Sequence, residues 1–316
     1  MLVGLVVDGA LVDRRRLPSN AAVQPWSFVS GIAEVALGLG QRHSCHISSV
    51  LVAVPGAIDR AGGTVRSASN LPFRDFPLAS ALGEGLGGAR VVIEHDANCG
   101  VVGEAWYGSA QGGCDVAYIT LSTGIGMGAL VDGRLIRGAH GSAGELGHIQ
   151  VAADGRPCGC GARGCLEAYA SGRSLALMGQ ELLAEGRTAL LGSVAADPGS
   201  VMARDVVVTA QQGDHACQAL IERAAGLVGD AIRLVQRVMD PAIVVVGGGL
   251  MSNGTFSDLV MAAAAPSGHA DDGSGGLPIV RRAALGEEGV LLGGIRLLAG
   301  DEGPVLLPDG RTPSTA

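Results

Sequence analysis

A group of cysteine and histidine residues lies near the middle of the chain, in a short glycine-rich stretch. His148 is followed by Cys158, Cys160 and Cys165. Three thiols and one imidazole are a set that zinc binds tetrahedrally in closed structural sites. Cys158 and Cys160 are too close together for an easy mutual disulfide. The pattern therefore favours a zinc ion over the two alternatives, free cysteines and disulfide-bonded cysteines.

Two carboxylates, Glu145 and Glu167, lie beside these residues, although zinc does not need them as ligands. Three glycines give the backbone the freedom to wrap the sulfur atoms around one ion: Gly159, Gly161 and Gly164. Our interpretation is that the metal shapes a loop, and that the loop points its carboxylates toward a polar ligand.

The sequence Gly-Ser-Ala-Gly-Glu-Leu-Gly-His at 141–148, with Cys-Gly-Cys-Gly-x-x-Gly-Cys-Leu-Glu at 158–167, resembles the signature of the ROK family. That family contains bacterial glucokinases, other sugar kinases and sugar-responsive repressors. The resemblance implies an α/β protein with a two-lobed actin-like ATPase (ribonuclease H-like) fold and a zinc-binding loop. We expect a small lobe of residues 1–98 and 287–300, a large lobe of residues 99–286, and a loose tail at 301–316.

The motif Glu-His-Asp-Ala-Asn at 94–98 follows a predicted strand. The resemblance implies that Asp96 is the general base, which accepts the proton of a sugar hydroxyl as that hydroxyl attacks the γ-phosphate of Mg-ATP. From the residues alone, Asp96 could equally cap the next helix. His95 stands where the family usually has Asn, and an imidazole differs from an amide in reach and in pH-dependent charge.

The resemblance also implies two sets of ligand-binding residues. The sugar is expected to contact Asn70, His95, Glu145, His148 and Glu167. The phosphates and the adenosine are expected at two glycine-containing turns, Ser122, Thr123, Gly124 and Gly126 in the first and Gly247, Gly248 and Gly249 in the second. Phe73 replaces a Gly that is usual after Asn70. Each turn would be weak evidence by itself.

Composition and charge restrict the other function classes. The 316 residues suffice for two domains, and 47% of them are hydrophobic. A net charge of −8 argues against nucleic-acid binding. Apolar runs fall short of the roughly 18 residues that a membrane helix needs. Because no signal peptide is visible, we expect a cytoplasmic protein in a reducing compartment.

Hydrophobic periodicity predicts two α/β lobes in which strands and helices follow one another. An Asp8-Gly9 turn should join the first two strands, Asp214 should cap a long helix, and Asp240-Pro241 should end it. The predicted strands are 1–7, 10–17, 50–54, 91–93, 116–121, 127–131, 243–246 and 279–282. The predicted helices are 25–39, 78–86, 100–107, 215–238 and 288–298.

One family feature is missing at the start. ROK proteins begin with a strand that ends in Asp-x-Gly-Gly-Thr, the first phosphate loop, and residues 1–7 match the strand that follows it. Either Met1 is an internal methionine of a longer protein, or the chain is a relative that binds sugar without turning over ATP. We expect impaired kinase activity in both cases.

Three functional hypotheses follow. The first is a sugar kinase that converts a hexose and ATP to hexose 6-phosphate and ADP, with glucose ahead of N-acetylmannosamine, N-acetylglucosamine and fructose. The second is a sugar-binding pseudo-kinase or regulator. DNA binding is not expected, since no helix-turn-helix segment is visible. The third is a zinc-stabilised scaffold. By analogy with the family we expect a homo-oligomer, either a dimer or a tetramer.

Overall fold

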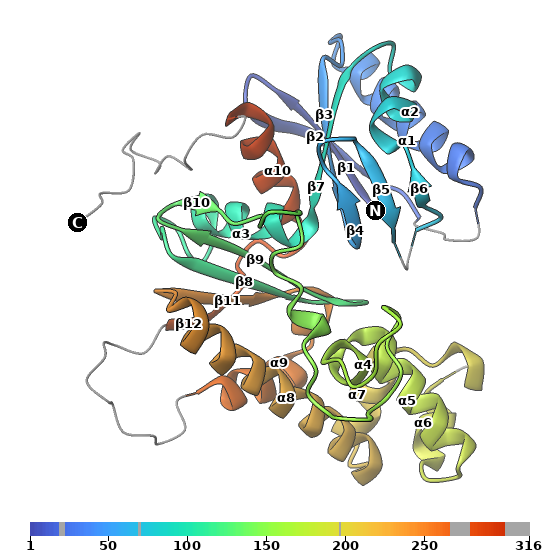
Figure 1. The fold of residues 1–316 in the computed structure, drawn as a ribbon. Helices are drawn as coiled ribbons and strands as arrows, with labels where there is room; N and C mark the ends of the chain where they lie inside the picture. The colour runs from blue at the N-terminus through green and yellow to red at the C-terminus, as the bar shows by residue number, and fades with distance from the viewer. Residues whose placement is uncertain (19–22, 69–70, 196, 266–278, 301–316) are drawn as a thin grey trace. The chain divides into compact units, whose positions relative to one another are not determined.

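The protein is described from a computed structural model (Figure 1), which covers residues 1–18, 23–68, 71–195, 197–265 and 279–300. The chain divides into two compact units, the first made of Met1–Cys114, Gly128–Ala143 and Glu287–Ala316 and the second of Asp115–Met127 and Gly144–Gly286. The predicted lobes had instead placed residues 99–114 and 128–143 in the second unit. The predicted tail at 301–316 lies outside the described residues.

The first unit opens with the predicted hairpin. Strands β1 (Leu2–Val7) and β2 (Ala10–Arg16) pair in antiparallel fashion. Asp8 and Gly9 connect them with positive φ angles of 51° and 80°. Positive φ angles at two consecutive residues are those of a type I′ turn, whose twist matches that of a hairpin, and the predicted Asp8-Gly9 turn is confirmed.

The rest of the first unit contains two more small sheets. Strands β3 and β7 pair in parallel, with Val54 opposite His95 at their carboxyl ends, and β4, β5 and β6 form an antiparallel sheet. The elements are α1 (Pro25–Arg42), β3 (Ser49–Val54), β4 (Ala57–Asp59), β5 (Thr64–Ser67), β6 (Arg74–Phe76), α2 (Leu78–Gly85) and β7 (Arg90–His95). Their apolar faces share one core that includes Phe28, Phe73 and Phe76.

Two helices of the first unit pack closely through glycines. Helix α3 (Asp96–Tyr107) lies against α10 (Glu288–Gly300). A Cβ on Gly103 would lie 2.1 Å from the Gly289 carbonyl oxygen, and a Cβ on Gly293 would lie 1.8 Å from that of Cys99. Only glycine allows backbones to approach so closely. This packing explains why α3 belongs to the first unit.

Helix α3 begins at Asp96, four residues before the predicted start. Its residues from Ala97 to Trp106 are all buried. A helix that is buried all round shows no amphipathic period, so the sequence pattern did not reveal its first turn.

The second unit is organised on parallel strands. The sheet order is β10-β9-β8-β11-β12, and β11 pairs in parallel with both β8 and β12. Strand β9 begins in the second unit and ends in the first, where β10 pairs with it. The strands are β8 (Val116–Leu121), β9 (Ile125–Val131), β10 (Arg134–Leu135), β11 (Ile243–Gly247) and β12 (Ile279–Arg282).

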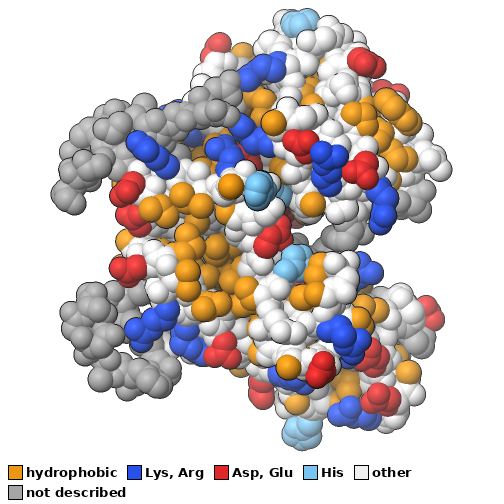
Figure 2. All heavy atoms as spheres, in the orientation of Figure 1, with side chains coloured by type: hydrophobic (Ala, Val, Ile, Leu, Met, Phe, Trp, Pro, Cys, Tyr) orange, Lys and Arg blue, Asp and Glu red, His pale blue; other side chains and the backbone are white. Residues whose placement is uncertain are grey.

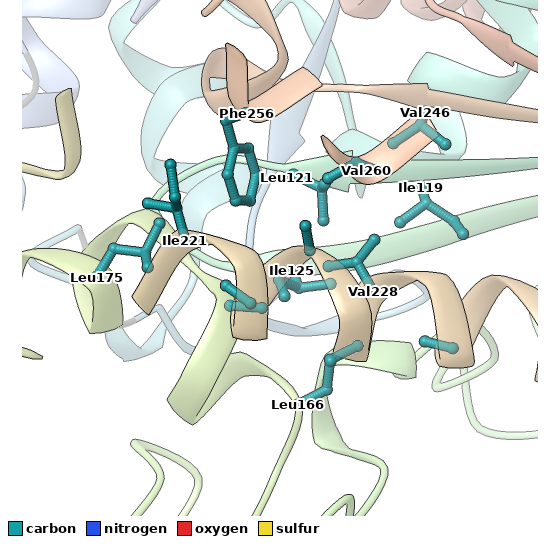
Figure 3. Packing of buried hydrophobic residues seen from close by; sticks show 14 of the residues in the cluster. Ile119, Leu121, Ile125, Leu166, Leu175, Ile221, Val228, Val246, Phe256 and Val260 are labelled. Atoms are coloured by element: carbon teal, nitrogen blue, oxygen red, sulfur yellow. The ribbon is translucent and has the colours of Figure 1, made fainter. Parts of the chain in front are cut away.

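The long helix α8 (His215–Met239) provides much of the core of this unit. As predicted, the Asp214 carboxylate caps it, accepting from the Cys217 N–H at 2.9 Å, and Asp240 ends it at φ 46°. Figure 3 shows Ile221 and Val228 of α8 among the buried side chains of this core. The remaining elements are η1 (Leu146–His148), α4 (Glu167–Ala170), α5 (Gly172–Ala184), α6 (Ala189–Val194), η2 (Pro198–Ser200), α7 (Ala203–Gln211), η3 (Gly249–Ser252) and α9 (Gly254–Ala264).

The surface carries charges of both signs. Figure 2 shows basic and acidic side chains interspersed on the face that it presents. Among the exposed ion pairs, the guanidinium nitrogens of Arg156 lie 2.6 Å and 2.8 Å from the carboxylate oxygens of Glu181. Among the helices that the structure describes, none has the length and apolar character needed to span a bilayer.

Candidate active site

The structure brings the four predicted metal ligands together in the second unit. One donor atom from each of His148, Cys158, Cys160 and Cys165 lies within 4.8 Å of the others. We call this group the Cys/His cluster. His148 ends η1, and the three cysteines come from the turn-rich segment that leads to α4. The segment folds back on itself through isolated bridges between Gln150 and Cys165 and between Pro157 and Arg163.

The spacing within the Cys/His cluster fits zinc. Ligands held tetrahedrally at Zn–S and Zn–N distances of about 2.3 Å and 2.0 Å are roughly 3.6–3.8 Å apart. The sulfur atoms of Cys160 and Cys165 are 3.7 Å apart, and the Cys158 sulfur lies 3.6 Å from His148 Nδ1. These two distances match edges of such a tetrahedron, and the donor set is one that zinc prefers. The cluster is therefore compatible with a structural zinc ion.

The thiols of the cluster have unequal acidities. Burial raises the pKa of Cys158, and burial together with the neighbouring thiols raises the pKa of Cys165 to about 12. A backbone hydrogen bond from Ala162 lowers the pKa of Cys160. Zinc binds the thiolate form, so metal uptake displaces the protons of Cys158 and Cys165, whose pKa values are raised.

The two carboxylates predicted beside the cluster have different surroundings. Glu145 is the exposed residue just before η1, and its Oε2 lies 3.6 Å from Nε2 of His148. His148 thus presents one ring nitrogen to the sulfurs and the other to a carboxylate. Glu167 opens α4, and its Oε2 accepts a 2.9 Å hydrogen bond from the Ile125 backbone N–H.

The two predicted nucleotide turns lie next to each other in the second unit. Residues 122–126 follow β8, and residues 247–249 end β11 and lead into η3. In the parallel register Gly247 stands opposite Thr120, and a Cβ on Gly248 would lie 2.3 Å from the Leu121 carbonyl oxygen. The carboxyl ends of neighbouring parallel strands are where α/β proteins bind ligands. Strand β9 begins at Ile125 rather than at Met127, so the first turn is shorter than predicted.

His95 and Asp96 lie in the first unit, where β7 passes directly into α3. Asp96 is the first residue of the helix and half-buried, and its Oδ1 accepts from the Ala97 N–H at 2.8 Å. His95 Nε2 is 3.1 Å from the Gly141 carbonyl oxygen. Since a carbonyl only accepts, Nε2 carries the proton in the neutral ring and Nδ1 is left as an acceptor.

A buried carboxylate stabilises the junction between β7 and α3. The sequence analysis assigned no role to this residue. Glu94 is 2% exposed. Its Oε2 lies 2.8 Å from Nε of Arg137 and 3.4 Å from Nε of Arg60. Its Oε1 accepts from the Asn98 amide at 2.8 Å and from the His95 N–H at 3.0 Å. We call Glu94, Arg60, Arg137 and Asn98 the Glu94 cluster.

The Glu94 carboxylate is kept ionised by its partners. Burial by itself would raise its pKa, but the hydrogen bond from Asn98 and the charge of Arg137 outweigh burial, and the pKa lies below the usual 4.5. Sequence reasoning missed the two arginines because they lie far from Glu94 along the chain. An acidic residue at the end of an apolar strand could have indicated a buried carboxylate, and a buried carboxylate requires a cationic partner.

Predicted sugar-contacting residue Asn70 lies outside the described residues. The other predicted site residues divide between the units: His95 and Asp96 belong to the first, and the two carboxylates, the Cys/His cluster and both turns belong to the second.

Comparison with known proteins extends this picture. The ROK family model matches residues 3–300. A glucokinase of Halalkalibacterium halodurans is 32% identical over 257 residues, 79% of this chain and 77% of that protein. An N-acetylmannosamine kinase of Shigella boydii is 33% identical over 243 residues, 76% of each. The crystal structure of a ROK family glucokinase from Streptomyces griseus in complex with glucose and AMPPNP matches with a TM-score of 0.76 and 29% identity, covering 93% of this chain and 94% of that one.

These similarities and the α/β architecture define an ATP-dependent sugar kinase of the actin-like ATPase fold. The chain belongs to the ROK family, as the signature around the Cys/His cluster predicted.

Proposed function

We propose that this protein transfers the γ-phosphoryl group of Mg-ATP to the 6-hydroxyl of a hexose, and that glucose is the preferred sugar. The observation that carries the proposal is the placement of Asp96, whose carboxylate begins α3 at the carboxyl end of β7. Asp96 accepts the hydroxyl proton as the sugar oxygen attacks phosphorus, and ADP leaves. Phosphoryl transfer depends mostly on positioning and charge neutralisation, so one well-placed carboxylate is sufficient.

The remaining predicted residues have supporting roles. We assign sugar hydroxyl contacts to Asn70, His95, Glu145, His148 and Glu167. Carboxylates suit this task because each accepts several hydrogen bonds. We assign the phosphates and the adenosine to the 122–126 and 247–249 turns, whose glycines leave backbone N–H groups accessible. Zinc in the Cys/His cluster would order the loop that carries Glu145 and Glu167.

Glucose is the leading candidate because a glucokinase is among the relatives. The N-acetylmannosamine kinase of Shigella boydii has a similar sequence identity to this chain, so N-acetylmannosamine is a second candidate. N-acetylglucosamine and fructose are the other candidates. His95 bears on this choice. With Nε2 turned to Gly141, its Nδ1 offers a sugar hydroxyl an acceptor only, whereas the usual Asn offers both a donor and an acceptor.

The substrate is tested by measuring ADP release with each of the four sugars in the wild-type protein and in His95→Asn. We expect glucose to give the highest kcat/KM. We expect His95→Asn to alter the relative kcat/KM values of the four sugars and to leave kcat on glucose largely unchanged. Turnover with none of them, alongside sugar binding by calorimetry, would favour the sugar-binding regulator instead.

The role of Asp96 is tested with Asp96→Asn, which keeps the size of the side chain and removes its basicity. We expect kcat to fall about 10²- to 10⁴-fold while the calorimetric affinity for the sugar changes little. Normal turnover by Asp96→Asn would refute Asp96 as the base. Light scattering of the same samples tests our expectation of a dimer or a tetramer.

A further inference from the structure

Glu167, which the family resemblance links to the sugar, contacts the nucleotide-side turn. It lies two residues after Cys165 and accepts from the Ile125 N–H at 2.9 Å. The same Oε2 would lie 2.6 Å from a Cβ on Gly124. The carboxylate therefore rests directly against the 122–126 turn, and Gly124 is the residue that leaves room for it.

Ile125 is also contacted from the other end of the Cys/His cluster. Gly147 immediately precedes His148, and a Cβ on Gly147 would lie 2.3 Å from the Ile125 carbonyl oxygen. The N–H of Ile125 is thus held from the Cys165 side and its carbonyl is packed from the His148 side. His148 is the first ligand of the cluster in the sequence and Cys165 is the last, and a residue close to each of them, Gly147 and Glu167, contacts the backbone of Ile125.

The connection between the cluster and the turn is short and buried. Leu166 is the only residue between Cys165 and Glu167, and its N–H donates to the Ile149 carbonyl at 2.9 Å. Figure 3 shows Leu166 and Ile125 in the same buried core. Leu166 is 1% exposed, which leaves this connection little freedom to move.

The chain just beyond α4 adds two more contacts. The N–H of Gly172 donates to the Ser122 carbonyl at 2.8 Å, and that of Arg173 donates to the Thr123 carbonyl at 3.2 Å. Ser122 and Thr123 of the turn and Ile125 at the start of β9 are therefore held by a segment that starts at a cysteine of the cluster. Ordering that segment also orders the turn.

We propose that metal binding at the Cys/His cluster and nucleotide binding at the 122–126 turn are thermodynamically coupled, with Glu167 as the positioning residue that joins them. The inference rests on the proposed role of the turn in binding nucleotide phosphates. Coupling is reciprocal, so zinc strengthens the binding of MgADP and MgADP retains the zinc by the same factor.

The test is to titrate MgADP, without sugar, into two samples in a calorimeter. One sample is zinc-loaded protein, and the other is protein from which a chelator has removed the zinc and dialysis has removed the chelator. In the wild type we expect zinc removal to weaken MgADP binding about tenfold. In Glu167→Ala the affinity should already be lower, and zinc removal should change it little. Glu167→Gln keeps an oxygen that can accept from Ile125, so it should restore much of the coupling.

Glu181→Gln is the matched control. The Glu181 carboxylate accepts from the guanidinium of Arg156, which belongs to the same cysteine-containing segment. We expect this variant to keep the full wild-type coupling. Equal loss of coupling in Glu181→Gln and Glu167→Ala would overturn the proposal, because any disturbance of the segment would then suffice.

A second measurement avoids the metal-free protein, in case that form does not fold. The rate at which a coloured chelator removes zinc from the loaded protein is followed with and without MgADP. MgADP should slow zinc loss in the wild type and not in Glu167→Ala. Equal rates despite measured MgADP binding overturn the coupling alone, whereas no MgADP binding to loaded wild type overturns the proposed nucleotide site as well.

Discussion

The turn that carries Asp96 and the loop that carries Glu167 are held in place by two different kinds of chemistry. The first depends on the Glu94 cluster, a buried carboxylate with two arginines and an amide drawn from separate parts of the first unit. The second depends on the Cys/His cluster, four ligands from one continuous segment of the second unit. A charge network needs the surrounding unit to be folded, whereas a metal site can order its own loop.

The largest effect is expected where the metal is lost. Cys165→Ser removes a buried ligand, and we expect it to lose zinc and to lower the free energy of unfolding by about 4 kcal/mol or more. Zinc content and urea unfolding measure both. Cys114→Ser, outside the cluster, is the control and should keep its zinc. If Cys165→Ser were as stable as this control, a structural role for the metal would be excluded.

The next effect is expected in the Glu94 cluster. Glu94→Gln leaves two arginines facing an uncharged amide, and we expect it to lower the free energy of unfolding by about 3 kcal/mol. Zinc content should not change, which separates the two clusters. Glu34→Gln on the exposed face of α1 is the control and should change stability by less than about 0.5 kcal/mol. Zinc loss in Glu94→Gln would contradict the separation.

A smaller effect is expected at the helix that starts with Asp96. Gly103→Ala would bring a Cβ to within 2.1 Å of the Gly289 carbonyl and force α3 away from α10. We expect a loss of about 2 kcal/mol, measured by urea unfolding. Gly226→Ala in α8 meets no atom within 4 Å, so it should stabilise by about 0.5–1 kcal/mol. Equal effects at the two glycines would mean that the α3–α10 contact is looser than described.

The smallest effect is expected from pH. The folded-state pKa of Glu94 is lowered below 4.5, so its stabilising contribution is present above about pH 4.5 and is lost as the pH falls through the folded pKa. The unfolding free energy of the wild type should therefore fall more steeply in acid than that of Glu94→Gln, which does not titrate there. Acid also releases zinc from both proteins, so the difference between their curves isolates Glu94. Parallel curves would contradict the assignment.

Local patterns predicted much of the fold. The Asp8-Gly9 turn and the Asp214 cap were confirmed because a tight turn and a helix N-terminus depend on a few adjacent residues. The start of α3 was missed because that helix is buried on all sides. The predicted roles of the sugar-contacting residues remain predictions, with Asp96 and His95 at the strand-to-helix junction that the motif indicated.

The sequence by itself determined the Cys/His cluster, because its ligands are close along one glycine-rich segment and their residue types suit one metal. Only the tertiary structure decided that Arg137, 43 residues from Glu94, neutralises that buried carboxylate. It also decided that Glu167 holds Ile125, 42 residues away. The reason is physical: donors and acceptors of common types have many possible partners along a chain, and only the packing of the folded unit selects one of them.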